Sequence, residues 1–85
     1  MEELIRKLND LLHQHFAGSE VEFEPAGARR LGGLIAWDGF AGLQQIERQR
    51  RVWQLIRAHL TPEEQQQISA LLTLTRGEMT AARAG

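Results

Sequence analysis

The feature that most constrains the fold of this chain is a helical pattern that runs from about Gly42 to Leu60. Its apolar residues recur at steps of three and four, the spacing of a helix that is buried on one side; they are Ile46, Val52, Trp53, Ile56 and Leu60. Gln49 lies in the middle of this face. A core-facing amide must find hydrogen-bond partners or cost about 1–3 kcal/mol. Gln49 is therefore either a structural tie to another element or a remnant of a former site.

Two segments near the N-terminus predict a layer against which this helix can pack. Residues 2–16 carry apolar side chains at helical spacing and end before Gly18, a natural helix C-cap. Residues 19–24 alternate strictly, with Val21 and Phe23 on one face and glutamates on the other. This alternation predicts a half-buried strand with a solvated acidic face.

A glycine-rich loop is expected over residues 25–33, followed by a second strand at 34–37 that is antiparallel to the first. Arg29 and Arg30 lie in this loop. Two such arginines are able to contact phosphate groups, but the loop lacks the Gly-Lys-Ser/Thr ending of a phosphate-binding loop. A solvated hairpin connection is the alternative interpretation.

The last third of the chain contains a helix start and an ambiguous apolar segment. Thr61, Pro62 and Glu64 have the pattern of an N-cap, a first-turn proline and a capping box, which predicts a short helical turn. Residues 68–75 satisfy both helical and strand periodicity. We favour a strand, because a two-stranded hairpin is marginal by itself and a third strand completes a sheet. The small residues over 80–85 predict a flexible tail.

Composition limits the classes of function. The 85 residues suffice for one small domain, which we place at 1–79, and the net charge of −1 gives no global attraction to nucleic acid or membrane. The chain has no cysteine and no apolar run of membrane-spanning length, and its acidic N-terminus is unlike a secretory signal. We therefore expect a cytoplasmic protein without thiol chemistry.

No catalytic or metal-binding constellation is visible in the sequence. His13 and His15 are two residues apart on one helix and point to different sides, so they cannot chelate one metal together. The serines and the histidines lie on unrelated predicted elements. We expect a protein that is not an enzyme and that holds no cofactor or metal of its own.

The predicted order of elements, αββαβ, and the residues around the long helix together resemble the BolA family. The motif positions that this chain fills without a gap are Asp38, Phe40, Gly42, Arg48, Arg50, Val52 and Trp53. Residues 68–71, Ile-Ser-Ala-Leu, resemble the start of the family's third strand. The resemblance covers roughly residues 4–79. It implies an α+β fold similar to a class II K-homology domain: a three-stranded sheet, two main helices on one face and a short extra helical turn before the third strand.

The resemblance also implies a function, which the departures from the family pattern limit. BolA-like proteins form heterodimers with monothiol glutaredoxins and share an iron–sulfur cluster with them. Here Gln49 replaces the histidine of an Arg-His-Arg triplet, Ser69 replaces the histidine of the third strand, and the hairpin loop has neither histidine nor cysteine. Serine is a poor substitute for an imidazole on iron. The resemblance thus implies an adaptor that lacks the usual cluster ligands.

Three hypotheses for the function follow. The first is a regulatory adaptor that binds a monothiol glutaredoxin or another iron–sulfur or redox-related protein. The second is a nucleic-acid-binding regulator that uses a basic strip, formed by Arg29, Arg30, Arg48, Arg50, Arg51 and Arg57. The alternative for these arginines is that Glu47 pairs with Arg51 and the others are solvated. The third is a partner-binding domain, monomeric or weakly homodimeric, with neither cluster nor nucleic acid.

Overall fold

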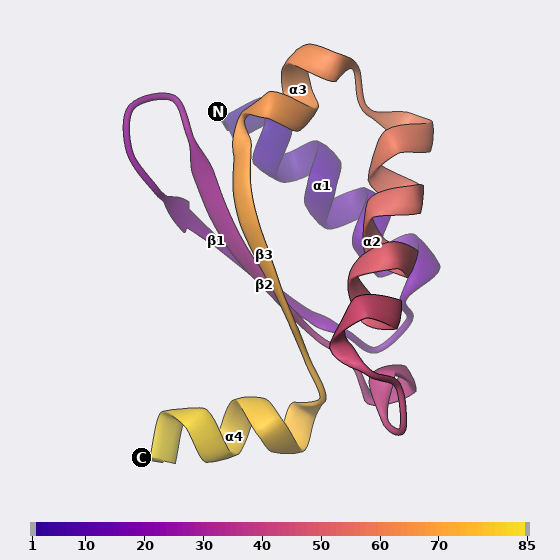
Figure 1. The fold of residues 1–85 in the computed structure, drawn as a ribbon. Helices are drawn as coiled ribbons and strands as arrows, with labels where there is room; N and C mark the ends of the chain where they lie inside the picture. The colour runs from indigo at the N-terminus through magenta and orange to yellow at the C-terminus, as the bar shows by residue number, and fades with distance from the viewer. Residues whose placement is uncertain (1, 85) are drawn as a thin grey trace.

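The computed structural model describes residues 2–84. In chain order, its elements are α1 (Glu2–His15), β1 (Glu20–Pro25), β2 (Leu31–Ala36), the helical turn η1 (Asp38–Phe40), α2 (Gln45–His59), α3 (Pro62–Gln66), β3 (Ile68–Leu74) and α4 (Arg76–Ala84) (Figure 1). The predicted α+β class and the order αββαβ are confirmed. The ambiguous segment is a strand, and α3 is the short helical turn that precedes it.

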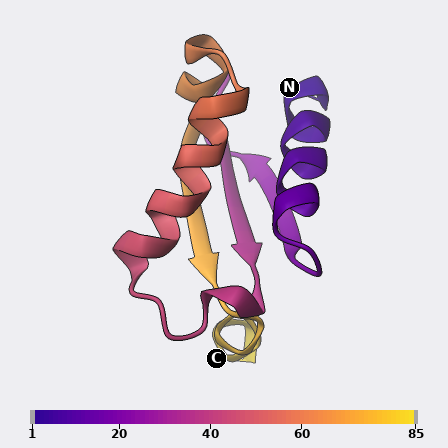
Figure 2. The ribbon, with the colours of Figure 1, turned by 90° about the vertical axis from the view of Figure 1, so that its right-hand side faces the viewer.

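The three strands form one sheet in the order β1-β2-β3. β1 and β2 are antiparallel, whereas β2 and β3 are parallel. A parallel pair needs a long crossover connection, which α2 and α3 provide. Figure 2 shows α1 and α2 side by side over one face of the sheet, running in opposite directions. The prediction of two main helices on one face is therefore correct.

The hydrophobic core lies between the sheet and these two helices. Its buried members are Leu4, Leu8, Leu11, Leu12, Phe16, Leu31, Ile35, Phe40, Val52, Ile56, Leu60, Ile68 and Leu71. The alternation along β1 is as predicted, since Val21 and Phe23 pack against this core while Glu22 and Glu24 are exposed. Across residues 2–84, no helix has both the length and the apolar character needed to span a membrane.

β2 begins earlier than the predicted strand, because Gly32 and Gly33 belong to the strand and not to the loop. A Cβ atom on Gly33 would lie 2.6 Å from ring carbons of Phe23 and 2.7 Å from Leu71 Cδ2. The absence of a side chain here leaves the space that the Phe23 ring occupies. The glycine pair is thus a packing feature of the sheet, and the hairpin loop is shortened to residues 26–30.

An aromatic cluster orders the segment between β2 and α2. Phe40 is buried in η1, with its ring centroid 5.9 Å from that of Phe16 and 5.2 Å from that of Trp37. Gly42 adopts a φ of +81°, a left-handed conformation that glycine tolerates best. As a result, α2 begins at Gln45 and not near Gly42, where the periodic pattern placed its start.

Residues 76–84 form the helix α4, which includes residues 80–84 of the segment that was expected to be a flexible tail; Gly85 lies outside the described residues. A capping box starts the helix: the Glu78 N–H donates to Thr75 Oγ1 at 3.1 Å, and the Thr75 N–H donates to Glu78 Oε1 at 2.8 Å. Met79 is buried, and α4 lies on the opposite side of the sheet from α1 and α2 (Figure 1). The Thr-x-x-Glu spacing is the sequence signal for this helix.

Replacing Gly33 by alanine should lower the free energy of unfolding by about 1–3 kcal/mol, because Phe23 or Leu71 must move. Gly32→Ala is the matched control, since its Cβ would meet nothing nearer than Ala26 Cβ at 3.4 Å. The control should leave stability unchanged or raise it by up to about 1 kcal/mol. Urea denaturation followed by circular dichroism measures both, and equal destabilisation would contradict the close packing over Gly33.

Candidate functional site

Side-chain hydrogen bonds join α2 to the edge strand β3 along a line that we call the α2–β3 seam. Gln49 Nε2 donates to Leu71 O at 2.7 Å and to Thr73 Oγ1 at 3.1 Å, while Trp53 Nε1 donates to Gln49 Oε1 at 3.2 Å. Thr73 Oγ1 donates to Gln45 Oε1 at 2.7 Å, and Gln45 Nε2 donates to Thr73 O at 3.1 Å. Gln49 is therefore a structural tie, because both polar atoms of its amide are engaged.

Arg48 completes the α2–β3 seam and is only 6% exposed. Its guanidinium donates to Leu43 O at 2.9 Å, to Thr73 O at 3.2 Å and to Glu78 Oε1 at 2.6 Å. A buried charge is tolerated where it is paired and hydrogen-bonded, and these partners meet that condition. Arg48 is thus inaccessible to a nucleic acid, which removes it from the predicted basic strip.

The buried stripe of α2 is rotated relative to the predicted one. Arg48, Val52 and Ile56 are its buried residues, whereas the helical pattern centred the face on Gln49. Ile46, predicted to face the core, is 64% exposed. The rotation follows from the partners of Arg48, because the guanidinium must reach β3 and α4 to be satisfied.

Glu78 connects the α2–β3 seam to α4. Its carboxylate binds the Arg48 guanidinium and also accepts the Thr75 N–H of the capping box. These interactions, above all the hydrogen bond from Arg48, lower the pKa of Glu78 from its ordinary value of 4.5 to about 2. The carboxylate therefore remains charged far below neutral pH, and Arg48 keeps its partner.

The remaining arginines of α2 are exposed. Arg50 pairs with Glu47 at 2.7 Å, so the expected Glu47–Arg51 pair is wrong. Arg51 and Arg57 also face solvent. The two arginines of the loop over residues 26–30 are exposed as well, but Figure 1 shows this loop on the side of the sheet away from α2. The structure therefore does not unite the six predicted arginines in one strip.

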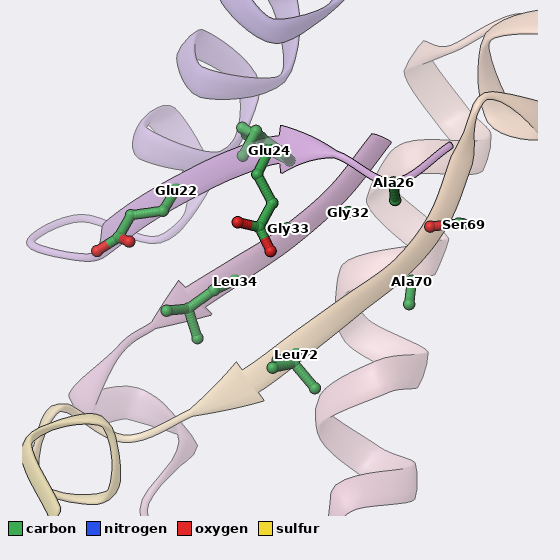
Figure 3. A pocket seen from close by; sticks show the side chains of 10 residues that line it. Glu22, Glu24, Ala26, Gly32, Gly33, Leu34, Ser69, Ala70 and Leu72 are labelled. Atoms are coloured by element: carbon green, nitrogen blue, oxygen red, sulfur yellow. The ribbon is translucent and has the colours of Figure 1, made fainter. Parts of the chain in front are cut away.

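The face of the sheet opposite α1 and α2 contains a hollow of about 450 Å³ that we call the open-face hollow. Small and apolar residues of β2 and β3 form its floor and glutamates of β1 border it; the main lining residues are Glu22, Glu24, Gly32, Gly33, Leu34, Ser69, Ala70 and Leu72 (Figure 3). Leu34 is paired with Leu72 across the parallel strands, and Leu72 is 60% exposed. Figure 1 shows α4 only at the end of the sheet where β3 ends, so it leaves the rest of this face uncovered.

A second, shallower hollow of about 300 Å³ lies along the outer side of α2. It is lined by Ile46, Gln49, Arg50, Trp53 and Arg57. Trp53 packs against the core as expected, but its side chain is only partly buried and also contributes to this surface. An apolar and aromatic strip therefore lies beside two exposed guanidinium groups.

Comparisons with known proteins identify solved structures with a similar arrangement of elements. No family model matches the chain, and no curated protein sequence matches it. Among solved structures, the crystal structure of a Bol-like protein from Babesia bovis matches with 24% sequence identity and a TM-score of 0.57, over 98% of this chain and 93% of that one. BolA1 from Arabidopsis thaliana matches with 21% identity and a TM-score of 0.62, over 88% of this chain and 92% of that one. This chain has the BolA-like fold.

Within the BolA-like fold, the two positions where the sequence resemblance implies histidines hold side chains that are bound to backbone carbonyls. Gln49 donates to Leu71 O at 2.7 Å, and Ser69 Oγ donates to Leu31 O at 3.2 Å. The described residues contain no group of three or more histidines, cysteines or carboxylates that could hold a metal ion. The amide of Gln49 and the hydroxyl of Ser69 therefore do not fit the role of cluster ligands at these two positions.

The other residues at which this chain resembles the family have structural roles in the fold. Asp38 and Phe40 form η1, Gly42 supplies the left-handed turn before α2, and Val52 is buried in the core. Sequence reasoning missed the open-face hollow, although the alternation of Leu72 with buried Leu71 and Thr73 was a signal for it. The exposed apolar face becomes apparent only once the strands are paired.

Replacing Gln49 by leucine should lower the free energy of unfolding by about 1–3 kcal/mol, because Leu71 O and Trp53 Nε1 lose their partner. Gln54→Leu, on the exposed side of the same helix, is the matched control. It should change stability by less than about 0.5 kcal/mol. Urea unfolding measures both variants, and indistinguishable midpoints would mean that the Gln49 amide is not a tie.

The depressed pKa of Glu78, about 2 in the folded protein, predicts a pH-dependent contribution to stability. The Arg48–Glu78 pair contributes fully above the ordinary pKa of 4.5, and its contribution is lost as the pH falls toward 2. Glu78→Gln should therefore be less stable than the parent at neutral pH, and the difference should shrink between about pH 4.5 and pH 2. Urea midpoints across that range provide the measurement. A difference that does not depend on pH would contradict the ionic origin of the contact.

Proposed function

We propose that this chain is a non-enzymatic, cytoplasmic adaptor that binds a protein partner through the open-face hollow. The observation that carries the proposal is the paired Leu34 and Leu72 on the uncovered face of the sheet. Contiguous apolar surface beside polar residues is typical of interaction sites. The glycines and the alanine of the floor deepen this surface, so that a partner's apolar side chain can enter it.

Helix α4 supports the proposal, because it already occupies one end of the same face. Its Met79 is buried, and two ion pairs join the helix to β1; the pairs are Arg76–Glu20 and Arg83–Glu22. These contacts support a partner that offers basic residues to the glutamates of β1. Glu24 borders the open-face hollow and has no ion pair within residues 2–84, which leaves it free for a basic group of the partner.

The BolA-like fold supports the choice of partner class. We propose a monothiol glutaredoxin or another redox-related protein, bound by surface contacts alone. Gln49 and Ser69 are engaged with backbone carbonyls, so this chain would contribute no ligand to a shared cluster. The complex would consequently form whether or not the partner carries a cluster.

A second candidate is nucleic-acid binding through the outer side of α2. The observation that favours it is the hollow in which Trp53 lies between Arg50 and Arg57. Aromatic rings stack on bases and guanidinium groups contact phosphates, which together form a sequence-tolerant binding surface. This candidate uses the opposite side of the molecule from the open-face hollow, so the two are separable.

The two large hydrophobic side chains that are exposed among the described residues offer matched variants, since Leu72 is 60% and Ile46 is 64% exposed. We expect the parent and Ile46→Lys to form a one-to-one complex with a monothiol glutaredoxin, and Leu72→Lys to bind at least tenfold more weakly. Gel filtration and titration calorimetry measure binding, and circular dichroism checks that both variants fold.

Three results would overturn this proposal: no complex with the parent, a complex unaffected by Leu72→Lys, or a loss confined to Ile46→Lys. If the parent does not bind glutaredoxin but shifts the mobility of single-stranded RNA in a gel, and if Arg57→Glu abolishes that shift, nucleic-acid binding replaces this proposal. Visible circular dichroism of a cluster-loaded glutaredoxin should be unchanged on binding. A changed spectrum would mean that this chain does ligate the cluster.

A further inference from the structure

Helices α1 and α2 bring together two histidines that are far apart in the sequence. The ring centroids of His15 and His59 are 5.7 Å apart, and the ring planes are tilted by 46°. Both side chains are exposed, and each lies in the last turn of its helix. The sequence pattern excluded a chelate between His13 and His15, but it could not show this pair, which depends on the packing of the two helices.

The direction of the helices explains why the rings meet. Figure 2 shows that α1 and α2 run in opposite directions over the sheet. Side chains on a helix lean toward its N-terminus. His15 therefore leans back along α1 and His59 leans back along α2, which directs each ring toward the other. The contact follows from the backbone arrangement of the two helices.

We propose that His15 and His59 form a binding site for one divalent transition-metal ion, such as Zn²⁺. Neutral imidazole is the commonest metal ligand in proteins. With zinc–nitrogen bonds of about 2.0–2.1 Å, two imidazoles on a tetrahedral ion have ring centroids roughly 5 Å apart. The observed 5.7 Å is close to that spacing. The partial negative charge at each helix C-terminus also favours a cation there.

The site is open to solvent. Residues 2–84 offer no group of three or more histidines, cysteines or carboxylates that could enclose a metal ion. The remaining coordination positions are therefore filled by water. The bound ion clamps α1 to α2, a role that is independent of the adaptor function and of the positions of Gln49 and Ser69.

His13 provides a matched control on the same helix turn. Its Nδ1 donates to Asn9 O at 2.8 Å, so its ring is held against its own helix. Replacing it removes one exposed imidazole without touching the pair. A metal effect that requires His15 and His59 but not His13 is the signature of this site, whereas general binding of zinc to surface imidazoles depends on all three.

The test is a titration of the tag-free, full-length chain with zinc chloride, followed by calorimetry and thermal melting. We expect one ion per chain and a higher melting temperature, because the ion binds only the folded arrangement. His15→Gln and His59→Gln should each weaken binding at least tenfold and abolish the rise in melting temperature, while His13→Gln retains both. Acidification should release the ion, because only the neutral imidazole binds.

Four results would overturn the proposal. They are no zinc binding by the parent, binding that survives either His15→Gln or His59→Gln, loss of binding in His13→Gln, and a zinc-bridged dimer in sedimentation equilibrium in place of a one-to-one complex. The three variants change exposed residues, so circular dichroism without zinc should give the parent spectrum. This control separates loss of the site from loss of the fold.

Discussion

The buried guanidinium of Arg48 is the interaction on which the other contacts of this fold depend. It donates to the carbonyl of Leu43 just before its own helix, to the carbonyl of Thr73 in β3 and to the Glu78 carboxylate that caps α4. Elements on both faces of the sheet are thereby joined through one side chain. Because a buried charge requires all of its partners, the positions of α2, β3 and α4 are mutually constrained, and Gln45 and Gln49 reinforce the same alignment.

This constraint also explains which parts of the structure could be predicted from the sequence. The strict alternation of β1, the leucines of α1 and the capping box of α3 are local signals, and all three elements were predicted correctly. The centre of the buried face of α2 was not, because two partners of Arg48, the Thr73 carbonyl and the Glu78 carboxylate, belong to segments that follow it in the chain. The start of β2 was missed for a similar reason: glycines indicate a turn until the ring of Phe23 is placed over Gly33.

The candidate sites were less predictable than the fold. The open-face hollow depends on the parallel register that sets Leu34 beside Leu72 and on how far α4 reaches across the sheet. Neither is encoded in a local pattern. By contrast, the two departures from the resemblance, Gln49 and Ser69, were visible in the sequence, and the structure adds that both side chains donate hydrogen bonds to backbone carbonyls. These hydrogen bonds tie Gln49 to β3 and Ser69 to β2.

The position of β3 has a consequence for self-association. β3 is an edge strand, and an edge with free carbonyls is a template for the addition of a strand from another molecule. Here side chains of α2 donate hydrogen bonds to the carbonyl oxygens of Leu71 and Thr73. The Leu74 carbonyl accepts a hydrogen bond from the Trp37 N–H. The chain thus protects its last strand against edge-to-edge aggregation with residues from its own preceding helix, and it does so without the proline or lysine that edge strands often carry.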